Sequence, residues 1–128
     1  MDKEPKLLVW NYTPEEKIKL DTLLEQTGAP SAATIDSTQA HLVLRDIIHT
    51  NASGEDHLES KEKVVLFYNI PPKGVFFLID TFKQAHLPQP IYAVVTEQSI
   101  EWPFSELLRH LVSERDKAKK GADQGAPE

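Results

Sequence analysis

The chain contains no cysteine among its 128 residues, which excludes disulfide bonds, thiolate catalysis and zinc sites built on cysteine. Glycine is scarce, with 5 residues, and neither GxGxxG nor GxxxxGK[ST] occurs, so the common phosphate-binding loops are excluded as well. No apolar run approaches the roughly 20 residues that a membrane-spanning helix needs. We therefore expect no membrane association.

Basic residues are also few, with 14 Lys and Arg against 20 Asp and Glu, and the formal net charge is −6. A polyanion would be repelled unless the basic residues gathered in one patch. They gather in one place, at Arg115, Lys117, Lys119 and Lys120. Because this is the end of a predicted helix, we interpret the group as a solvated helix terminus and expect no nucleic-acid partner.

Length and composition predict one domain over residues 1–120, large enough to bury a core. The charged start MDKEPK, followed only by LLVW, is not typical of a signal peptide, so we expect a cytoplasmic protein. The polar segment Thr50–Lys63 and the tail Gly121–Glu128 have little apolar area to bury. We expect both to be disordered.

The central pattern is an alternation of short apolar runs with helical segments. VVLFYN at 64–69 and IYAVVT at 91–96 are each followed by residues with helical spacing, and KLLVWN at 6–11 is a third run. Such runs predict strands buried on both faces, lying side by side and parallel. The predicted fold is α/β, a three-layer domain with a mostly parallel sheet of three or four strands and helices on both faces. Residues 32–35 are a weaker strand candidate.

Four helices are expected. The first begins with a capping box of Thr13 and Glu16 around Pro14 and ends at Gly28, with Leu20, Leu23 and Leu24 inward and Ile18 on the opposite side. The second runs from Asp36 or Ser37 to about His49. The third follows Pro71-Pro72, and we expect it to be the most buried because Phe76 and Phe77 widen its apolar arc. The last buries Phe104, Leu107, Leu108, Leu111 and Val112.

The chain carries a faint internal echo. LLVWNYTPEE and VVLFYNIPPK both join a strand that ends at an Asn/Tyr pair to a helix that begins at proline. We take the echo as support for the strand–helix assignment alone.

The ends of the strands are the expected place for a site, because ligands of parallel sheets bind beyond the carboxyl ends of the strands. The candidate binding residues there are Asn11, Asn69, Thr96, Ser99 and Trp102. The same residues also have a purely structural interpretation. Serine and threonine cap helices, asparagine tolerates left-handed turns, and Trp102 can cover the edge of the core. The sequence leaves both interpretations open.

No catalytic set is recognisable. Thr96 ends a strand where phosphoacceptor receivers place a threonine, but Asn11 and Asn69 stand where such domains need carboxylates for magnesium and phosphoryl transfer. The five histidines form no i, i+3 or i, i+4 pair and no HExxH motif. We expect no catalytic residues, no metal site and no cofactor.

One stretch resembles a known family. It consists of Ala93-Val94-Val95-Thr96, Trp102 six positions later, Leu107-Leu108, Leu111 and Glu114. Over about residues 64–115 the chain resembles the bacterial family named domain of unknown function 3783. Tyr92, Ser99 and Asn69 depart from that family, which usually has lysine, asparagine, and glycine or serine there. The resemblance implies a small α/β domain and no assigned activity.

Two functions follow as hypotheses. The first is a non-catalytic interaction or binding module whose partner is another protein or a second copy, favoured by surplus apolar residues such as Ile18, Leu42 and Phe76. The second is a small ligand or anion sensor, or an enzyme, that uses Asn69, Thr96 and Ser99 at the sheet edge. A flat apolar patch would favour the first, and a pocket with converging polar groups would favour the second.

Overall fold

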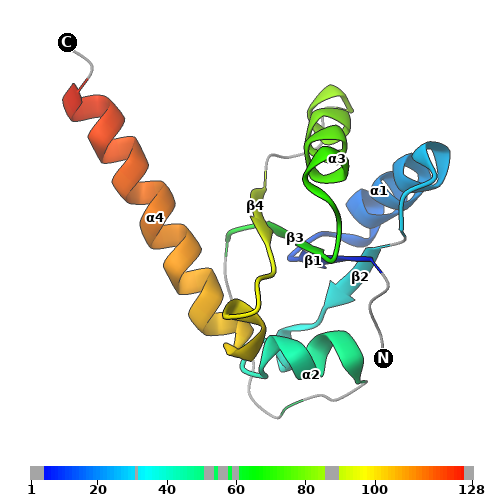
Figure 1. Cartoon of the computed structure of the whole chain (residues 1–128), viewed down its shortest axis with the longest axis horizontal. Coiled ribbons are helices and arrows are strands. Elements are labelled where there is room, and N and C mark those ends of the chain that lie inside the picture. The colour runs from blue at the N-terminus through cyan, green and yellow to red at the C-terminus, as the bar shows by residue number, and fades with distance from the viewer. Residues whose placement is uncertain are drawn as a thin grey trace.

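A four-stranded mixed sheet forms the centre of the computed structural model, which describes residues 5–30, 32–50, 54, 58, 61–85 and 90–125, with side chains as far as 118. The strands are β1 (Lys6–Trp10), β2 (Ala32–Ile35), β3 (Val64–Tyr68) and β4 (Ile91–Val94). Their order across the sheet is β2-β1-β3-β4 (Figure 1). The weak candidate strand at residues 32–35 is therefore confirmed.

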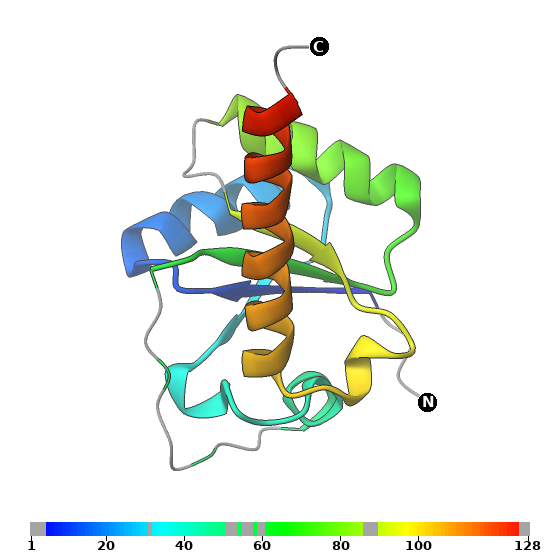
Figure 2. The same ribbon diagram turned by 90° about the vertical axis from the view of Figure 1, so that its left-hand side faces the viewer.

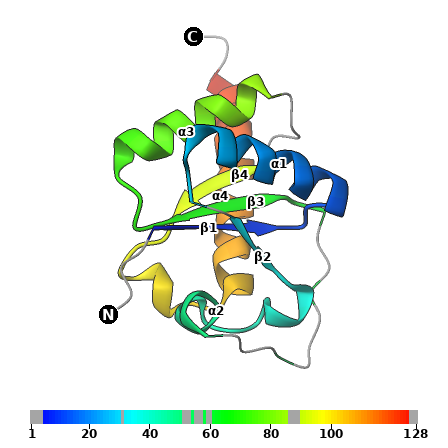
Figure 3. The same cartoon turned by 90° about the vertical axis from the view of Figure 1, so that its right-hand side faces the viewer.

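Helices cover both faces of this sheet. They are α1 (Pro14–Thr27), α2 (Leu44–His49), α3 (Pro72–Gln84) and α4 (Phe104–Gly125), with short 3-10 helices η1 (Ser37–Gln39) and η2 (Ser99–Glu101). Figure 3 shows α1 and α3 on one side of the strands and α2 on the other, and Figure 2 shows α4 crossing in front of the sheet. The three-layer α/β prediction is confirmed. Among the described helices, none has the length and apolar character needed to cross a membrane.

The two cores follow from the alternation of side chains along the strands. Toward α1 and α3, β1 and β3 point Leu7, Val9, Val65 and Phe67, which pack against Leu20, Leu24, Val75, Leu78 and Phe82. Toward α2 and α4 they point Leu8, Trp10, Val64 and Leu66, which pack against Leu44, Ile47, Phe104, Leu107 and Leu108. The predicted inward stripes of the first and last helices are confirmed, with Leu23, Leu111 and Val112 only partly buried.

Helix α1 begins and ends as predicted. The backbone N–H of Glu16 donates to Thr13 Oγ1 at 3.1 Å, and the Thr13 N–H donates to Glu16 Oε1 at 2.9 Å, which completes the capping box. Gly28 ends the helix with φ +72°, a left-handed conformation that favours glycine.

The expectation that strands 6–11, 64–69 and 91–96 are all parallel is wrong. β1 pairs with β2 in parallel and β3 with β4 in parallel, but β1 and β3 are antiparallel, with Trp10 opposite Val64. The handedness rule for crossovers governs connections between parallel strands. The chain passes from β2 to β3 through η1, the short helix α2 and the polar residues 50–63, so β3 can start beside the end of β1.

Antiparallel pairing makes the molecule a pseudo-twofold arrangement of two similar units. Unit 1 is β1-α1-β2-η1-α2 and unit 2 is β3-α3-β4-η2-α4, in the same order of elements. In the strand order β2-β1-β3-β4, the first strand of each unit lies at the centre of the sheet and the second strand of each unit lies at an edge. Leu8 and Leu66, each the third residue of its strand, lie opposite each other at the centre. The structural repeat thus extends beyond the strand and helix that carry the sequence echo.

A second contact lies on the same pseudo-axis. The residues immediately before α2 and α4, Val43 and Pro103, form an isolated antiparallel bridge. The Leu44 N–H donates to the Trp102 carbonyl at 2.9 Å, and the Phe104 N–H donates to the Leu42 carbonyl at 3.0 Å. Equivalent residues of the two units therefore exchange equivalent hydrogen bonds.

Two predicted elements differ from the structure. The helix expected from residue 36 or 37 to 49 is broken into η1 and α2, because the chain leaves the helical path at 40–43 to make the bridge to Pro103. The strand expected at 91–96 ends at Val94 and is not buried on both faces. As an edge strand, β4 leaves Val94 48 % exposed.

Helix α3 is not the most buried helix, contrary to expectation. Val75, Leu78 and Phe82 are buried, but Phe76 is 70 % exposed and Phe77 55 % exposed. The apolar arc of α3 is wider than the sheet face it covers. Leu42, expected as a surplus apolar residue, instead packs half-buried against the core.

The expected disordered segments fall largely outside what the structure describes. Of residues 50–63, those at 51–53, 55–57 and 59–60 lie outside the described residues, as do 126–128. Helix α4 continues to Gly125, so the backbone at 121–125 is helical where a tail was expected.

Candidate functional site

The antiparallel pairing places the candidate residues at two opposite ends of the strands. Asn69 and Thr96 follow the carboxyl ends of β3 and β4, whereas Asn11 follows the carboxyl end of β1, which lies at the other end of the sheet. The expectation that Asn11 shares a site with Asn69 is therefore wrong. Each asparagine instead lines its own cleft, and the two occupy equivalent positions in the two units.

The cleft of unit 2 has a volume of about 410 Å³ and is open to solvent. Tyr68, Val95 and Ile100 supply apolar surface. Arg45, Asn69, Thr96 and Glu97 supply polar groups. Two members of the set come from the sequence prediction, Asn69 and Thr96, and the cleft adds charges of both signs.

Asn69 has φ +58° and Asn11 has φ +68°. Both asparagines turn the chain sharply after a strand, in the left-handed region that asparagine tolerates better than most residues. The structural interpretation of these two residues is thus confirmed for the backbone. Asn69 is in addition one of the residues that line the cleft.

Thr96 and Ser99 hold the turn that follows β4. The Ser99 N–H donates to Thr96 Oγ1 at 3.0 Å, the Thr96 N–H donates to Ser99 Oγ at 2.8 Å, and the two hydroxyls lie 3.1 Å apart. Ser99 is only 6 % exposed. Both hydroxyls are therefore engaged within the turn, as in a capping box.

Trp102 lies away from this cleft lining, partly buried against the core of α2 and α4. Its ring centroid is 5.1 Å from that of His110 on α4. This contact agrees with the interpretation of Trp102 as a cover for the edge of the core.

Arg45 is the cleft residue that sequence reasoning missed. It comes from α2 of unit 1 and forms an ion pair with Glu101 of η2, so unit 1 completes the cleft of unit 2. Both side chains are about half exposed. No local pattern marks Arg45, because its position beside β3 and β4 depends on the cross-axis bridge between Val43 and Pro103.

The equivalent contact across the pseudo-axis joins His41 and Ser105, whose Nδ1 and Oγ atoms lie 3.2 Å apart. Unit 1 has its own cleft of about 360 Å³, lined by Asn11, Tyr12, Asp36, Ser37 and apolar neighbours. In the described part of the chain, this cleft has no arginine or lysine in its lining. The two clefts are thus alike in position and different in charge.

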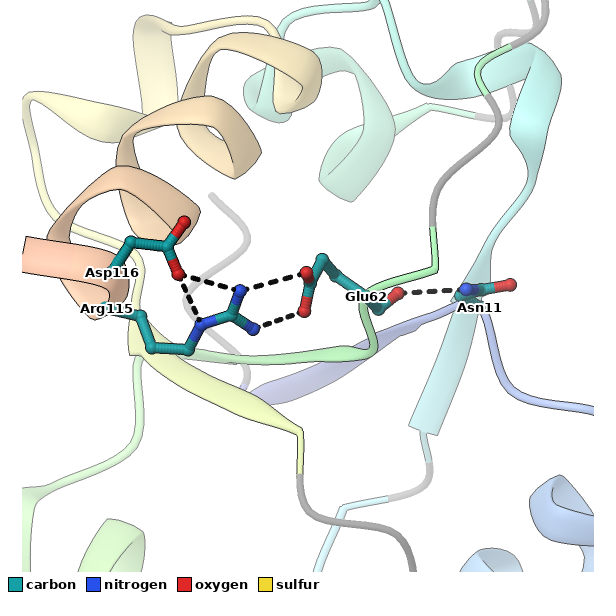
Figure 4. A network of polar contacts seen from close by, with 4 residues as sticks. All are labelled: Asn11, Glu62, Arg115 and Asp116. Atoms are coloured by element: carbon teal, nitrogen blue, oxygen red, sulfur yellow. Dashed lines mark hydrogen bonds and ion pairs between the residues drawn. The ribbon is translucent and has the colours of Figure 1, made fainter. Parts of the chain in front are cut away.

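A polar network fixes Asn11 (Figure 4). Its side-chain amide donates to the Glu62 carbonyl at 2.9 Å. The Glu62 carboxylate accepts hydrogen bonds from both terminal nitrogens of the Arg115 guanidinium. Asp116 accepts a further hydrogen bond from Arg115 Nη2 at 3.1 Å. These bonds raise the pKa of Arg115 above its ordinary value. Arg115 therefore ties α4 to the entry of β3, rather than extending into solvent as the sequence suggested.

Lys63 makes a second tie at the same edge. Its Nζ donates to the Asn11 carbonyl and to Glu16 Oε1, both at 2.8 Å, and lies 5.2 Å from the centre of the Tyr12 ring. The hydrogen bond from Lys63 lowers the pKa of Glu16, and burial raises the pKa of Tyr12. Asn11 thus belongs to a structural network at the junction of β1 and β3.

Metal ligands do not converge in the part of the chain that the structure describes. No group of three or more histidine, aspartate or glutamate side chains there could hold a metal ion. Two buried polar atoms, Trp10 Nε1 and the Tyr92 hydroxyl, have no hydrogen-bond partner among the described residues. Both lie within aromatic packing, Trp10 against Phe104 and Tyr92 between Phe67 and Phe82.

Comparison with known proteins adds one finding. Residues 63–117 match the model of a family described as a domain of unknown function (DUF3783), which supports the resemblance over less than half of the chain. The matched segment covers β3, α3, β4, η2 and the first part of α4, which is unit 2. No curated protein and no solved structure matches the chain.

Proposed function

We propose that the protein is a cytoplasmic, non-catalytic interaction module that binds a second copy of itself through the outer face of α1 and α3. The observation that carries the proposal is a set of large apolar side chains exposed there. Ile18 on α1 is 65 % exposed, and Phe76 and Phe77 on α3 are 70 % and 55 % exposed. Adjacent exposed apolar side chains, such as Phe76 and Phe77 on α3, are typical of contact surfaces.

The pseudo-symmetry of the molecule favours a second copy as the partner. Ile18 is the fifth residue of α1 and Phe76 is the fifth residue of α3, so the two occupy equivalent positions in the two units. Because β1 and β3 are antiparallel, these residues lie toward opposite ends of the α1–α3 layer. A second copy presents the same two points in reverse order, so Phe76 of each copy can meet Ile18 of the other in one twofold contact.

Shape supports the contact of α3 on one copy with α1 on the other. A hollow of about 290 Å³ is lined by Ile18, Leu23 and Ala85 together with the polar residues Lys19, Thr22 and Gln26. Its apolar part can receive an aromatic ring. The exposed charges of the two helices are of both signs, with Lys73, Asp80 and Lys83 on α3 and Glu15, Lys19 and Glu25 on α1, and they do not set the alignment.

The polar groups of the two strand-end clefts support a non-catalytic role. Thr96 and Ser99 bond each other, and Asp36 and Gln39 form the equivalent box in unit 1. With its net charge of −6 and Arg115 engaged by Glu62, the protein offers little to a polyanion, so we do not expect nucleic acid as a partner.

Sedimentation equilibrium on the whole protein tests the proposal. Wild type should form dimers in a concentration-dependent manner, and Phe76→Ser and Ile18→Ser should each weaken the dimer at least about tenfold, since each is lost from two contacts. Val94→Ser, an exposed apolar residue on the β4 edge, is the matched control and should leave the association unchanged. A wild-type monomer at about 1 mM would overturn the proposal. Loss of the dimer through Val94→Ser alone would do the same, because the interface would then be the sheet edge.

A further inference from the structure

The cleft of unit 2 has a composition that points to a particular class of ligand. Its lining combines one cation, Arg45, and one anion, Glu97, with the apolar surface of Tyr68, Val95 and Ile100. The neutral polar residues Asn69 and Thr96 complete it. Small-molecule sites are typically mostly apolar, with a few polar groups that fix orientation. A ligand that satisfies this lining carries a negative group, a positive group and an apolar body.

Arg45 is already placed to hold a carboxylate. Its guanidinium pairs with the Glu101 carboxylate at the edge of the cleft, with both side chains about half exposed. An exposed ion pair contributes little to stability, so a carboxylate that also gains apolar contacts can replace Glu101. Glu97, on the exposed turn after β4, offers its carboxylate to an ammonium group.

We infer that this cleft binds a small zwitterion, an α-amino acid with an apolar side chain. Arg45 receives the α-carboxylate in place of Glu101, Glu97 receives the α-ammonium, and the apolar side chain lies against Tyr68, Val95 and Ile100. Asn69 lines the same space, and its side-chain amide has donors and an acceptor that suit either charged group. This inference is independent of the proposed self-association, because the cleft lies beyond the carboxyl ends of β3 and β4 and not on the outer face of α1 and α3.

The equivalent cleft of unit 1 serves as an internal control for the role of Arg45. It has a similar volume, about 360 Å³, and an equivalent asparagine, Asn11. Where unit 2 has Arg45 against Glu101, the equivalent contact is Ser105 against His41. Without an arginine in its described lining, this cleft should not hold the carboxylate.

Titration of the whole protein with L-leucine and L-phenylalanine, followed by calorimetry and backbone NMR, tests the inference. Binding should shift signals at Arg45, Asn69 and Thr96 and leave those at Asn11 and Ser37 unmoved. N-acetyl-L-leucine lacks the ammonium and L-leucine methyl ester lacks the carboxylate, and each should bind at least about tenfold more weakly than leucine.

Variants separate the two charges. Arg45→Ala and Glu97→Gln should each weaken binding about tenfold or more, whereas Glu101→Gln should strengthen it because the internal competitor is removed. Arg109→Ala and Glu114→Gln, exposed residues on α4, are the charge-matched controls and should not change it. The inference is wrong if neither amino acid shifts the cleft signals at millimolar concentration. It is also wrong if the ester and the acetyl derivative bind as well as leucine, or if the signals at Asn11 move instead.

Discussion

The Thr96 and Ser99 side chains each bind the other residue's backbone N–H, at 3.0 and 2.8 Å, and so close the turn between β4 and η2. Asp36 and Gln39 close the equivalent turn of unit 1 in the same reciprocal manner, with the Asp36 N–H donating to Gln39 Oε1 at 2.9 Å. The residue types differ, but the pattern of donors and acceptors is the same. These hydroxyls belong to the turn that shapes the cleft.

We predict that Ser99→Ala lowers the free energy of unfolding by about 1–3 kcal/mol, because it removes a buried hydroxyl and leaves the part-buried Thr96 N–H without its acceptor. Within this turn Ser99 is the buried residue, and Thr96, Glu97 and Gln98 are exposed. Thr96→Val should cost about 0.5–2 kcal/mol through loss of the bond from the Ser99 N–H. Denaturant unfolding measures both, with Ser113→Ala on the exposed side of α4 as control. Unchanged stability in both variants would mean that the hydroxyls do not hold the turn.

Core substitutions should separate the buried from the exposed faces of the helices. Phe82 is 3 % exposed and Leu108 is 6 % exposed, one in each core. Phe82→Ala and Leu108→Ala should each cost about 2–5 kcal/mol, because each leaves a cavity. Phe76→Ala on the same helix as Phe82 should cost less than about 0.5 kcal/mol in the monomer. An equal loss for Phe76 and Phe82 would mean that the faces of α3 are assigned wrongly.

The ion pair between Glu16 and Lys63 predicts a pH dependence of stability. The hydrogen bond from Lys63 holds the pKa of Glu16 below its ordinary value of 4.5 in the folded protein. A lowered folded pKa stabilises the fold above the ordinary value, and this contribution is lost as the pH falls below about 4.5 through the folded pKa. Glu16→Gln and Lys63→Met should therefore both flatten the fall in unfolding free energy between about pH 5 and pH 3. A profile identical to that of wild type in both variants would refute this assignment.

Asn11 and Asn69 share a left-handed backbone conformation but differ in their side-chain hydrogen bonds, so their substitutions should have partly different effects on stability. At either position, replacement by alanine should cost about 1–2 kcal/mol, because Cβ disfavours the left-handed region without a compensating side-chain bond. Asn69→Gly should be close to neutral, since glycine accepts that conformation. Asn11→Gly should still destabilise, because the bond to the Glu62 carbonyl is lost. Thermal unfolding of the four variants would contradict the account if Asn69→Gly and Asn11→Gly were equivalent.

Much of the architecture could be predicted from local patterns. Short continuous apolar runs located β1 and β3. The capping box around Pro14 and the glycine at position 28 fixed the limits of α1, because each of these signals acts within a few residues. The direction of β3 relative to β1 could not be predicted in this way. It depends on a connection of more than a dozen residues, where the chain can return from either end.

The candidate site was predictable in its parts and not in its assembly. Asn69 and Thr96 follow from the rule that strand ends carry sites, and the structure places both in one cleft. Arg45 could not be found, because the cross-axis bridge at Val43 brings it there from the other unit. The helical periodicity of α3 also could not predict that Phe76 is exposed, because only the packed structure shows how much of the helix the sheet covers.

The most direct test of self-association is an isotope-filtered NOE experiment on a mixture of labelled and unlabelled whole protein, which detects contacts between copies alone. We expect intermolecular NOEs between the Phe76 ring of one copy and the Ile18 and Leu23 methyl groups of the other, and we expect Phe76→Ser to abolish them. Intermolecular NOEs confined to β4 or α4, or none at concentrations where sedimentation shows dimers, would contradict it.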